Sequence, residues 1–80
     1  MKIKTLFFGI TADLVGQHEL EIDLKKSVYI ADFKTLLKEK FPKLAKINAY
    51  AIAVNEAYAE GDYSIKEGDV VAVIPPVSGG

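Results

Sequence analysis

The chain reads His18-Glu19-Leu20-Glu21-Ile22-Asp23-Leu24-Lys25 over one short stretch, in which polar and apolar side chains alternate strictly. Such alternation is typical of a β-strand with one face on the core and the other in water. The predicted core face holds Leu20, Ile22 and Leu24. This is the clearest strand pattern in the sequence, and an apolar stretch shortly before it predicts an antiparallel hairpin.

That preceding stretch, residues 2–10, predicts the first strand. Its inward face is expected to hold Ile3, Thr5 and Phe7. Its outward face, which it shares with Lys4, holds Leu6, Phe8 and Ile10. Apolar side chains on an outward face indicate a surface for a partner, although a half-covered edge strand explains them equally well. Residues 11–16 predict a turn or a short helical piece.

The next segment predicts the main helix of the fold. Apolar residues recur every three or four positions from Ile30 to Phe41, with lysines and Glu39 between them. This spacing places the apolar side chains along one helix face. Ser27 is the expected N-cap, and Pro42 predicts an end near Lys40, because the residue before a proline disfavours helix. Residues 41–48 are expected to form an irregular turn.

The rest of the chain predicts three more strands. They cover residues 49–54, 57–59 and 70–74, with turns at 55–56 and 66–69. One main helix packed across one mixed sheet of about five strands buries the apolar faces most simply, so the predicted class is α+β. The first and last strands are the most apolar, and we expect them to be central, parallel neighbours.

Composition limits the possible functions of the 80-residue chain, which is short enough for a single domain. Ten lysines, no arginine and a net charge of −1 argue against nucleic-acid and membrane partners. The absence of cysteine excludes a thiol nucleophile and is compatible with a cytoplasmic location. The lone His18 is expected to be a surface residue, no metal-ligand spacing is present, and the serines lack an evident base.

The last six residues, Pro75-Pro76-Val77-Ser78-Gly79-Gly80, predict a thin arm after the final strand. Prolines stop a strand, and glycines have no Cβ, so such an arm can enter a narrow passage. We therefore predict a domain over residues 1–75 and a flexible tail over residues 76–80. The carboxylate of Gly80 is then a candidate reactive group, and a frayed end without function is the alternative. Without cysteine, any sulfur the chain carries would have to sit on that carboxyl group.

Three motifs carry a resemblance to a known family. They are Leu6-Phe7-Phe8-Gly9 with Asp13-Leu14-Val15-Gly16, then Ala53-Val54-Asn55 with Glu67-Gly68-Asp69-Val70-Val71-Ala72, and finally the Pro-Pro-Val-Ser-Gly-Gly end. In these the chain resembles the small, sulfur-carrying subunits of molybdopterin synthases. The middle, residues 25–48, matches only as a helix of suitable length. The resemblance implies a ubiquitin-like β-grasp fold.

The resemblance also implies a chemical role for the tail. An ATP-using enzyme similar to the ubiquitin-activating enzymes would adenylate Gly80, and a sulfur donor would convert it into a thiocarboxylate. The tail (Pro75, Pro76, Val77, Ser78 and Gly79) would insert into a large catalytic subunit. There the sulfur passes to precursor Z, a cyclic pyranopterin monophosphate, and forms a dithiolene. This chain would bind no cofactor and would not itself be the catalyst, and the expected complex is a heterotetramer.

Residues for docking follow from the same resemblance, which assigns the contact with the large subunit to Phe8, Tyr58 and Ile74. One departure is that an Arg-Glu pair common in the family is replaced by Ala12 and Asp13. If that arginine forms an interface ion pair in other members, this chain lacks the pair, and its partner affinity or choice is expected to differ. Loss of such a rim charge would mainly affect the association rate. The alternatives are a sulfur carrier for another pathway such as thiamine synthesis, a ubiquitin-like modifier joined to protein lysines, and an interaction module with an inert tail.

Overall fold

A mixed β-sheet with a helix across one face forms the body of the protein in the computed structural model, which describes residues 1–47 and 49–76. The elements follow in the order β1 (Lys2–Phe7), α1 (Ile10–Val15), β2 (Glu19–Asp23), α2 (Ile30–Lys40), the 3-10 helix η1 (Pro42–Lys46), β3 (Ala51–Val54), β4 (Ala57–Tyr58) and β5 (Val70–Ile74).

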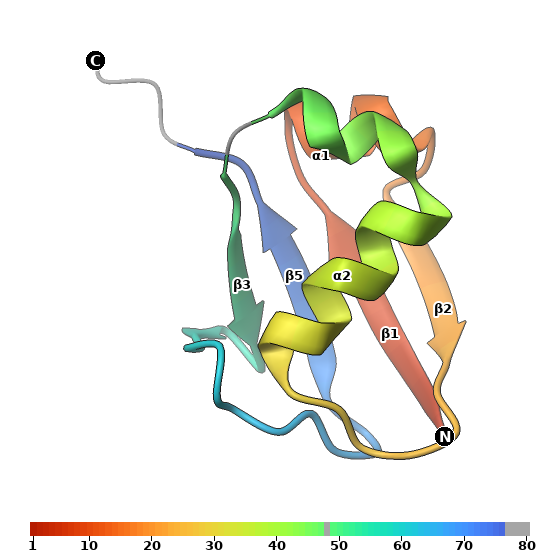
Figure 1. Cartoon of the computed structure of the whole chain (residues 1–80), viewed down its shortest axis with the longest axis vertical. Coiled ribbons are helices and arrows are strands. Elements are labelled where there is room, and N and C mark those ends of the chain that lie inside the picture. The colour runs from red at the N-terminus through yellow and green to blue at the C-terminus, as the bar shows by residue number, and fades with distance from the viewer. Residues whose placement is uncertain (48, 77–80) are drawn as a thin grey trace.

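The strand order in the sheet is β2-β1-β5-β3-β4. The first and last strands, β1 and β5, pair in parallel inside the sheet, and β1 and β2 form the predicted antiparallel hairpin. β3 pairs antiparallel with β5 on one side and β4 on the other. Figure 1 shows that β5 ends on the side of the sheet where α1 lies and β3 begins, opposite the N-terminus.

The core lies between α2 and the sheet (Figure 1). Alternate strand residues point into it, as the sequence predicted for Ile3, Thr5 and Phe7. On β2, Ile22 is buried and Leu20 is half-buried, and Leu24, directly after the strand, is buried as well. The largest fully buried side chains are Phe7, Phe33, Ile3, Ile22, Ile30, Leu37, Leu44, Ile52, Ile65, Val71, Val73 and Thr5.

The first strand is shorter than predicted. It ends at Phe7 because Gly9 takes a left-handed φ of +54°, which interrupts the extended backbone. Ile10 then begins α1, so its exposure belongs to a helix and not to a strand face. The helical alternative for residues 11–16 is confirmed.

The predicted N-cap at Ser27 is wrong, because α2 begins at Ile30 with Tyr29 as its cap residue. Tyr29 makes no capping hydrogen bond with its side chain. The amides of Ile30 and Ala31 instead donate to the carbonyls of Tyr63 and Gly61, at 2.9 and 3.1 Å. Backbone groups distant in sequence therefore satisfy amides at the start of the helix, which a cap search along the local sequence cannot detect.

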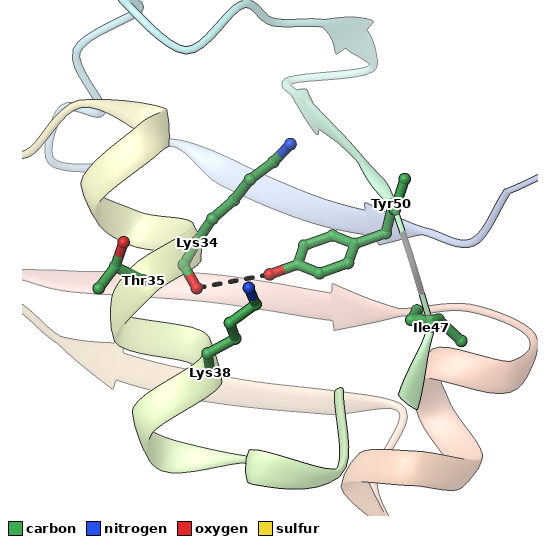
Figure 2. Close-up of a pocket in the computed structure, with 6 residues that line it drawn as sticks. Lys34, Thr35, Lys38, Ile47 and Tyr50 are labelled. Atoms are coloured by element: carbon green, nitrogen blue, oxygen red, sulfur yellow. Dashed lines mark hydrogen bonds between the residues drawn. The ribbon is translucent and has the colours of Figure 1, made fainter. Parts of the chain in front are cut away.

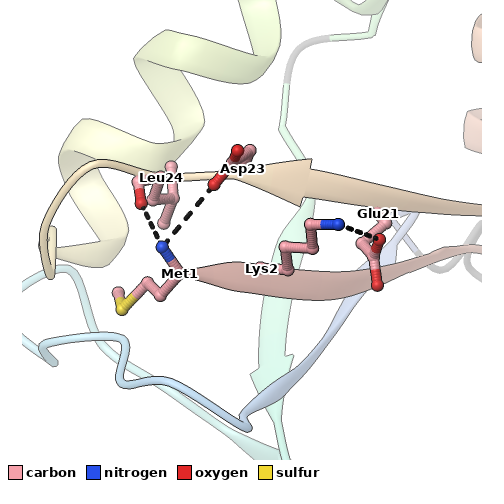
Figure 3. A network of polar contacts seen from close by, with 5 residues as sticks. All are labelled: Met1, Lys2, Glu21, Asp23 and Leu24. Atoms are coloured by element: carbon pink, nitrogen blue, oxygen red, sulfur yellow. Dashed lines mark hydrogen bonds and ion pairs between the residues drawn. The ribbon is translucent and has the colours of Figure 1, made fainter.

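Ion pairs line the outer face of the β1–β2 hairpin. Lys2 pairs with Glu21 and Lys4 with Glu19, each at 3.7 Å, and the amino group of Met1 lies 3.5 Å from Asp23. That amino group also donates to the Leu24 carbonyl at 2.7 Å (Figure 3). The first two pairs are well exposed, so each adds less than about 1 kcal/mol to stability.

None of the helices in the described ranges is both long and apolar enough to cross a membrane.

Candidate functional site

The described part of the tail leaves the sheet at the end of β5. Pro75 is half-buried and Pro76 is exposed, directly after Ile74. Two consecutive prolines remove two backbone donors, so strand pairing cannot continue through them. The predicted tail residues Val77, Ser78, Gly79 and Gly80 lie outside the described residues. The boundary between a domain at 1–75 and a tail at 76–80 therefore stays a prediction.

The loop after β1 packs against this exit point. A Cβ added to Gly9 would lie 3.0 Å from the Cγ atom of Pro75, so only a glycine fits there without a shift. The Phe8 amide donates to the Val73 carbonyl at 3.2 Å and to the Thr11 hydroxyl at 3.0 Å. The loop is thereby joined to the strand that carries the tail.

Thr11 is a buried residue whose role the sequence did not reveal. Its hydroxyl donates to the Phe8 carbonyl at 2.6 Å and lies 3.2 Å from the Val73 carbonyl. One hydroxyl thus links the loop at Phe8 to the last residues of β5. The local pattern that could have indicated this contact is a threonine three residues after Phe8, because threonine hydroxyls often bond to nearby backbone groups.

The sheet face opposite α2 carries the predicted docking residues. The strand register aligns Leu6 with Ala72, Ala72 with Ala53, and Ala53 with Tyr58, which forms a row across four strands. Ile74, in the next row toward the tail, lies on the same face because side chains alternate along β5. The two central alanines are small, so the larger residues around them leave a hollow.

This docking hollow has a volume of about 390 Å³. Its wall includes all three residues assigned to docking, Phe8, Tyr58 and Ile74. Phe8 is 48% exposed and Tyr58 is 73% exposed, values that are high for aromatic side chains. The structure thus brings together three residues that are far apart in sequence, beside the exit of the tail. The remaining lining residues are Leu6, Ala53, Asn55, Glu56, Val70 and Ala72.

A polar network stabilises the turn between β3 and β4, which lines part of the docking hollow. Asn55 and Glu56 connect β3 to β4 with φ angles of +50° and +72°. The Asn55 side chain donates to Asp69 at 3.0 Å and accepts from the Val70 amide at 3.0 Å. Asp69 also accepts from the Lys66 amide at 2.8 Å and from the Tyr63 hydroxyl at 3.3 Å. The network therefore stabilises a backbone geometry that asparagine tolerates better than most residues.

Asp69 gives the fold a specific acid sensitivity. Burial alone would raise the pKa of Asp69, but hydrogen bonds from Lys66, Asn55 and Tyr63, with the charge of Lys66, lower the pKa below its ordinary 3.8. The unfolded chain therefore takes up this proton at a higher pH than the folded chain. The stability that Asp69 contributes is complete well above pH 3.8 and is lost as pH falls through the folded pKa.

We expect Asp69→Asn to lower the free energy of unfolding by about 1–3 kcal/mol at neutral pH, because an amide presents a donor where a carboxylate accepted. The same change should flatten the loss of stability on acidification. Urea unfolding at neutral pH and across the acid range measures both effects. Glu67→Gln, at an exposed neighbouring position, is the control. An unchanged acid profile for Asp69→Asn would contradict the assignment.

The remaining candidate chemistry is sparse. His18 is exposed, and its backbone carbonyl accepts a hydrogen bond from the Phe7 amide at 2.8 Å. Within residues 1–47 and 49–76, histidine and acidic side chains form no group of three or more that could hold a metal ion. Ala12, at the position where the resemblance predicted an arginine, is 4% exposed and packs in the core, and Asp13 is exposed.

The sequence matches the ThiS family over residues 5–80. The chain belongs to the ThiS family. One relative, the molybdopterin synthase sulfur carrier subunit of Caenorhabditis elegans, is 37% identical to this ThiS-family chain over 83 aligned positions. The alignment covers 100% of this chain and 99% of the relative.

Solved structures agree with the family assignment. A Pyrococcus furiosus protein, described provisionally as subunit 1 of a molybdopterin converting factor, matches with a TM-score of 0.86 and 32% identity. The match covers 96% of this ThiS-family chain and 99% of the other. One chain in the protein-protein complex of subunits 1 and 2 of the molybdopterin-converting factor from Helicobacter pylori matches with a TM-score of 0.69 and 26% identity. This match covers 100% of this chain and 100% of that chain. The predicted ubiquitin-like β-grasp fold and the sulfur-carrier resemblance are confirmed.

Proposed function

We propose that this chain is the sulfur-carrying subunit of a molybdopterin synthase. The observation that carries the proposal is the apolar hollow beside Pro75 and Pro76, in a chain that aligns along its whole length with sulfur carrier subunits. The hollow provides a place for a partner to bind. The same partner can then receive the tail that leaves the sheet next to it.

The proposed reactive group is the carboxylate of Gly80. Expelling an oxide from a carboxylate is too costly, so the group must first be activated. Attack of the carboxylate on the α-phosphate of ATP, in an adenylating partner enzyme, forms an acyl adenylate and releases pyrophosphate. A sulfide donor then attacks the acyl carbon, AMP leaves, and a thiocarboxylate remains. The thiocarboxylate sulfur forms a bond to precursor Z while it is still attached to the acyl carbon. Water then cleaves the acyl carbon–sulfur bond, which leaves the sulfur on the substrate and restores the carboxylate of Gly80.

The proposed partner is a large catalytic subunit. The Helicobacter pylori match is a complex of two subunits, which supports an assembly of this kind here. In it, Phe8, Tyr58 and Ile74 would be covered, and the tail from Pro75 to Gly80 would enter the large subunit. Exposed aromatic residues around a small-residue floor suit such a contact, since aromatic anchors carry much of the energy in protein interfaces.

Reconstitution tests this function. The thiocarboxylated chain and the large subunit of the same organism are mixed with precursor Z, and molybdopterin is quantified. Since a dithiolene holds two sulfur atoms and each chain carries one, we expect one molybdopterin for every two thiocarboxylated chains and none from the carboxylate form. Sulfur transfer that occurs only with thiamine-synthesis enzymes, without molybdopterin, would favour the other carrier pathway. Covalent adducts of the chain on protein lysines as the main product would favour a protein modifier. Either result would contradict the proposal.

A further inference from the structure

Lysines are concentrated in one part of the chain without acidic partners. Residues 34–46 contain five of the ten lysines and only one acid, Glu39. Over residues 1–47 and 49–76, the ion pairs lie along the β1–β2 hairpin and involve none of these five lysines. A chain with a net charge of −1 therefore still presents an uncompensated positive region.

Two of these lysines border a second hollow, the basic pocket. It has a volume of about 210 Å³ and lies between α2 and the segment before β3. Figure 2 shows Lys34 and Lys38 extending from neighbouring turns of α2 on the side of Tyr50, with Ile47 on the side of the pocket away from α2. The other lining residues are Thr35 and Ala49.

Tyr50 holds one side of the basic pocket in place. Its hydroxyl donates a long hydrogen bond of 3.4 Å to the Lys34 carbonyl, and Lys34 Nζ lies 5.4 Å from the ring centroid. A cation at this distance from a ring is attracted to it, so Lys34 is directed over the pocket. Lys38, one turn later, adds a second positive charge to the same side, and like charges at this spacing repel each other. A negative group between the two ammonium groups would remove that repulsion.

The basic pocket, on the α2 side of the sheet, is linked through an intermediate hollow to the docking hollow on the opposite face. It shares Ala49 and Tyr50 with an intermediate hollow that extends to Pro75 and Pro76. That intermediate hollow in turn shares Tyr58 and Ile74 with the docking hollow. The three hollows thus follow one another from the face opposite α2, past the exit of the tail, to the two lysines on α2.

We propose that the basic pocket binds an acidic side chain, aspartate or glutamate, of the same partner that receives the tail. The inference rests on the proposed function, since it assigns the pocket to that partner. Continuity with the docking hollow favours a protein carboxylate over a free small anion. Lys38 is moreover exposed to water, and an ion pair between an exposed lysine and a single small anion contributes little binding energy. Charges at such a rim mainly raise the association rate and its sensitivity to salt.

The test compares two double charge reversals. Lys34→Glu with Lys38→Glu changes the basic pocket, and Lys25→Glu with Lys26→Glu makes the same change in net charge between β2 and α2, at the opposite end of the sheet from the tail. Affinity and association rate with the large subunit are measured at low and physiological salt. We expect the pocket variant to bind at least about tenfold more weakly with a reduced salt dependence, and the control to change less than about threefold. Lys34→Gln with Lys38→Gln should give a smaller loss, and thermal unfolding checks that each variant is folded.

Three results would overturn the proposal. These are equal losses in the two charge reversals, tighter binding by the pocket variant, and saturable binding of inorganic phosphate that shifts the NMR signals of the pocket residues at submillimolar concentration. If the wild-type chain itself does not bind the large subunit, the proposed function fails together with the pocket. If the wild type binds and the pocket variant matches the control, only the pocket assignment fails.

Discussion

Removal of Gly80 should abolish sulfur transfer and leave the fold intact. The shortened chain still ends in a glycine carboxylate, but its reactive group lies about 3.5 Å short of the original position along an extended tail. A displacement of even 1 Å can reduce a rate by about a hundredfold, so we expect a loss of at least that size. Folding should be unaffected, because β5 ends at Ile74 and, among the residues up to Pro76 that the structure describes, the core cluster includes none after Val73.

The matched control for this deletion is Ser78→Ala, which alters the tail but keeps its length. We expect it to retain most of the activity, since it leaves both glycines and the reach of the carboxyl group unchanged. Each chain is activated, mixed with the large subunit, and assayed for molybdopterin, while circular dichroism follows the fold. Product formation by the shortened chain at the wild-type rate would show that the Gly80 carboxyl is not the sulfur carrier.

The second large effect is expected at the docking hollow. Phe8→Asp or Ile74→Asp places a charge where an apolar contact is proposed, and desolvating that charge costs about 2 kcal/mol or more. This corresponds to a loss of about thirtyfold in affinity for the large subunit. Both side chains point away from the core, and Phe8 is 48% exposed, so the variants should fold.

Tyr29→Asp is a suitable control for these variants. Tyr29 is an exposed aromatic residue, at 55%, but it precedes α2 and lines neither the docking hollow nor the basic pocket. Titration calorimetry measures the affinity of each variant, and urea unfolding measures its stability. Unchanged affinity in both Phe8→Asp and Ile74→Asp would refute the docking assignment, whereas unfolding would mean that these side chains contribute to the core.

The fold was predictable because its signals are local. Alternation along residues 18–25 and the helical spacing from Ile30 to Phe41 each follow from which side chains must be buried. The start of α2 was not predictable, because its first amides bond to the carbonyls of Gly61 and Tyr63. The end of β1 was missed because nothing in the sequence distinguishes a left-handed Gly9 from an ordinary strand glycine.

The site was predictable only in part, for a similar reason. Alternation pointed Phe8 outward, and the family resemblance added Tyr58 and Ile74. The alanine floor between them depends on the register that aligns Ala72 with Ala53, and no local pattern gives that register. The basic pocket depends on Tyr50 lying beside α2, which is likewise a contact between distant segments.

Intact mass spectrometry tests the central claim most directly. The chain is incubated with ATP, the adenylating enzyme of the same organism and a sulfide donor, and omission of ATP is the control. A chain that carries sulfur on Gly80 should gain the mass difference between one sulfur and one oxygen, only with ATP, and fragmentation should place the gain on the last residue. An unchanged mass in the complete reaction, or a gain located elsewhere in the chain, would contradict the claim.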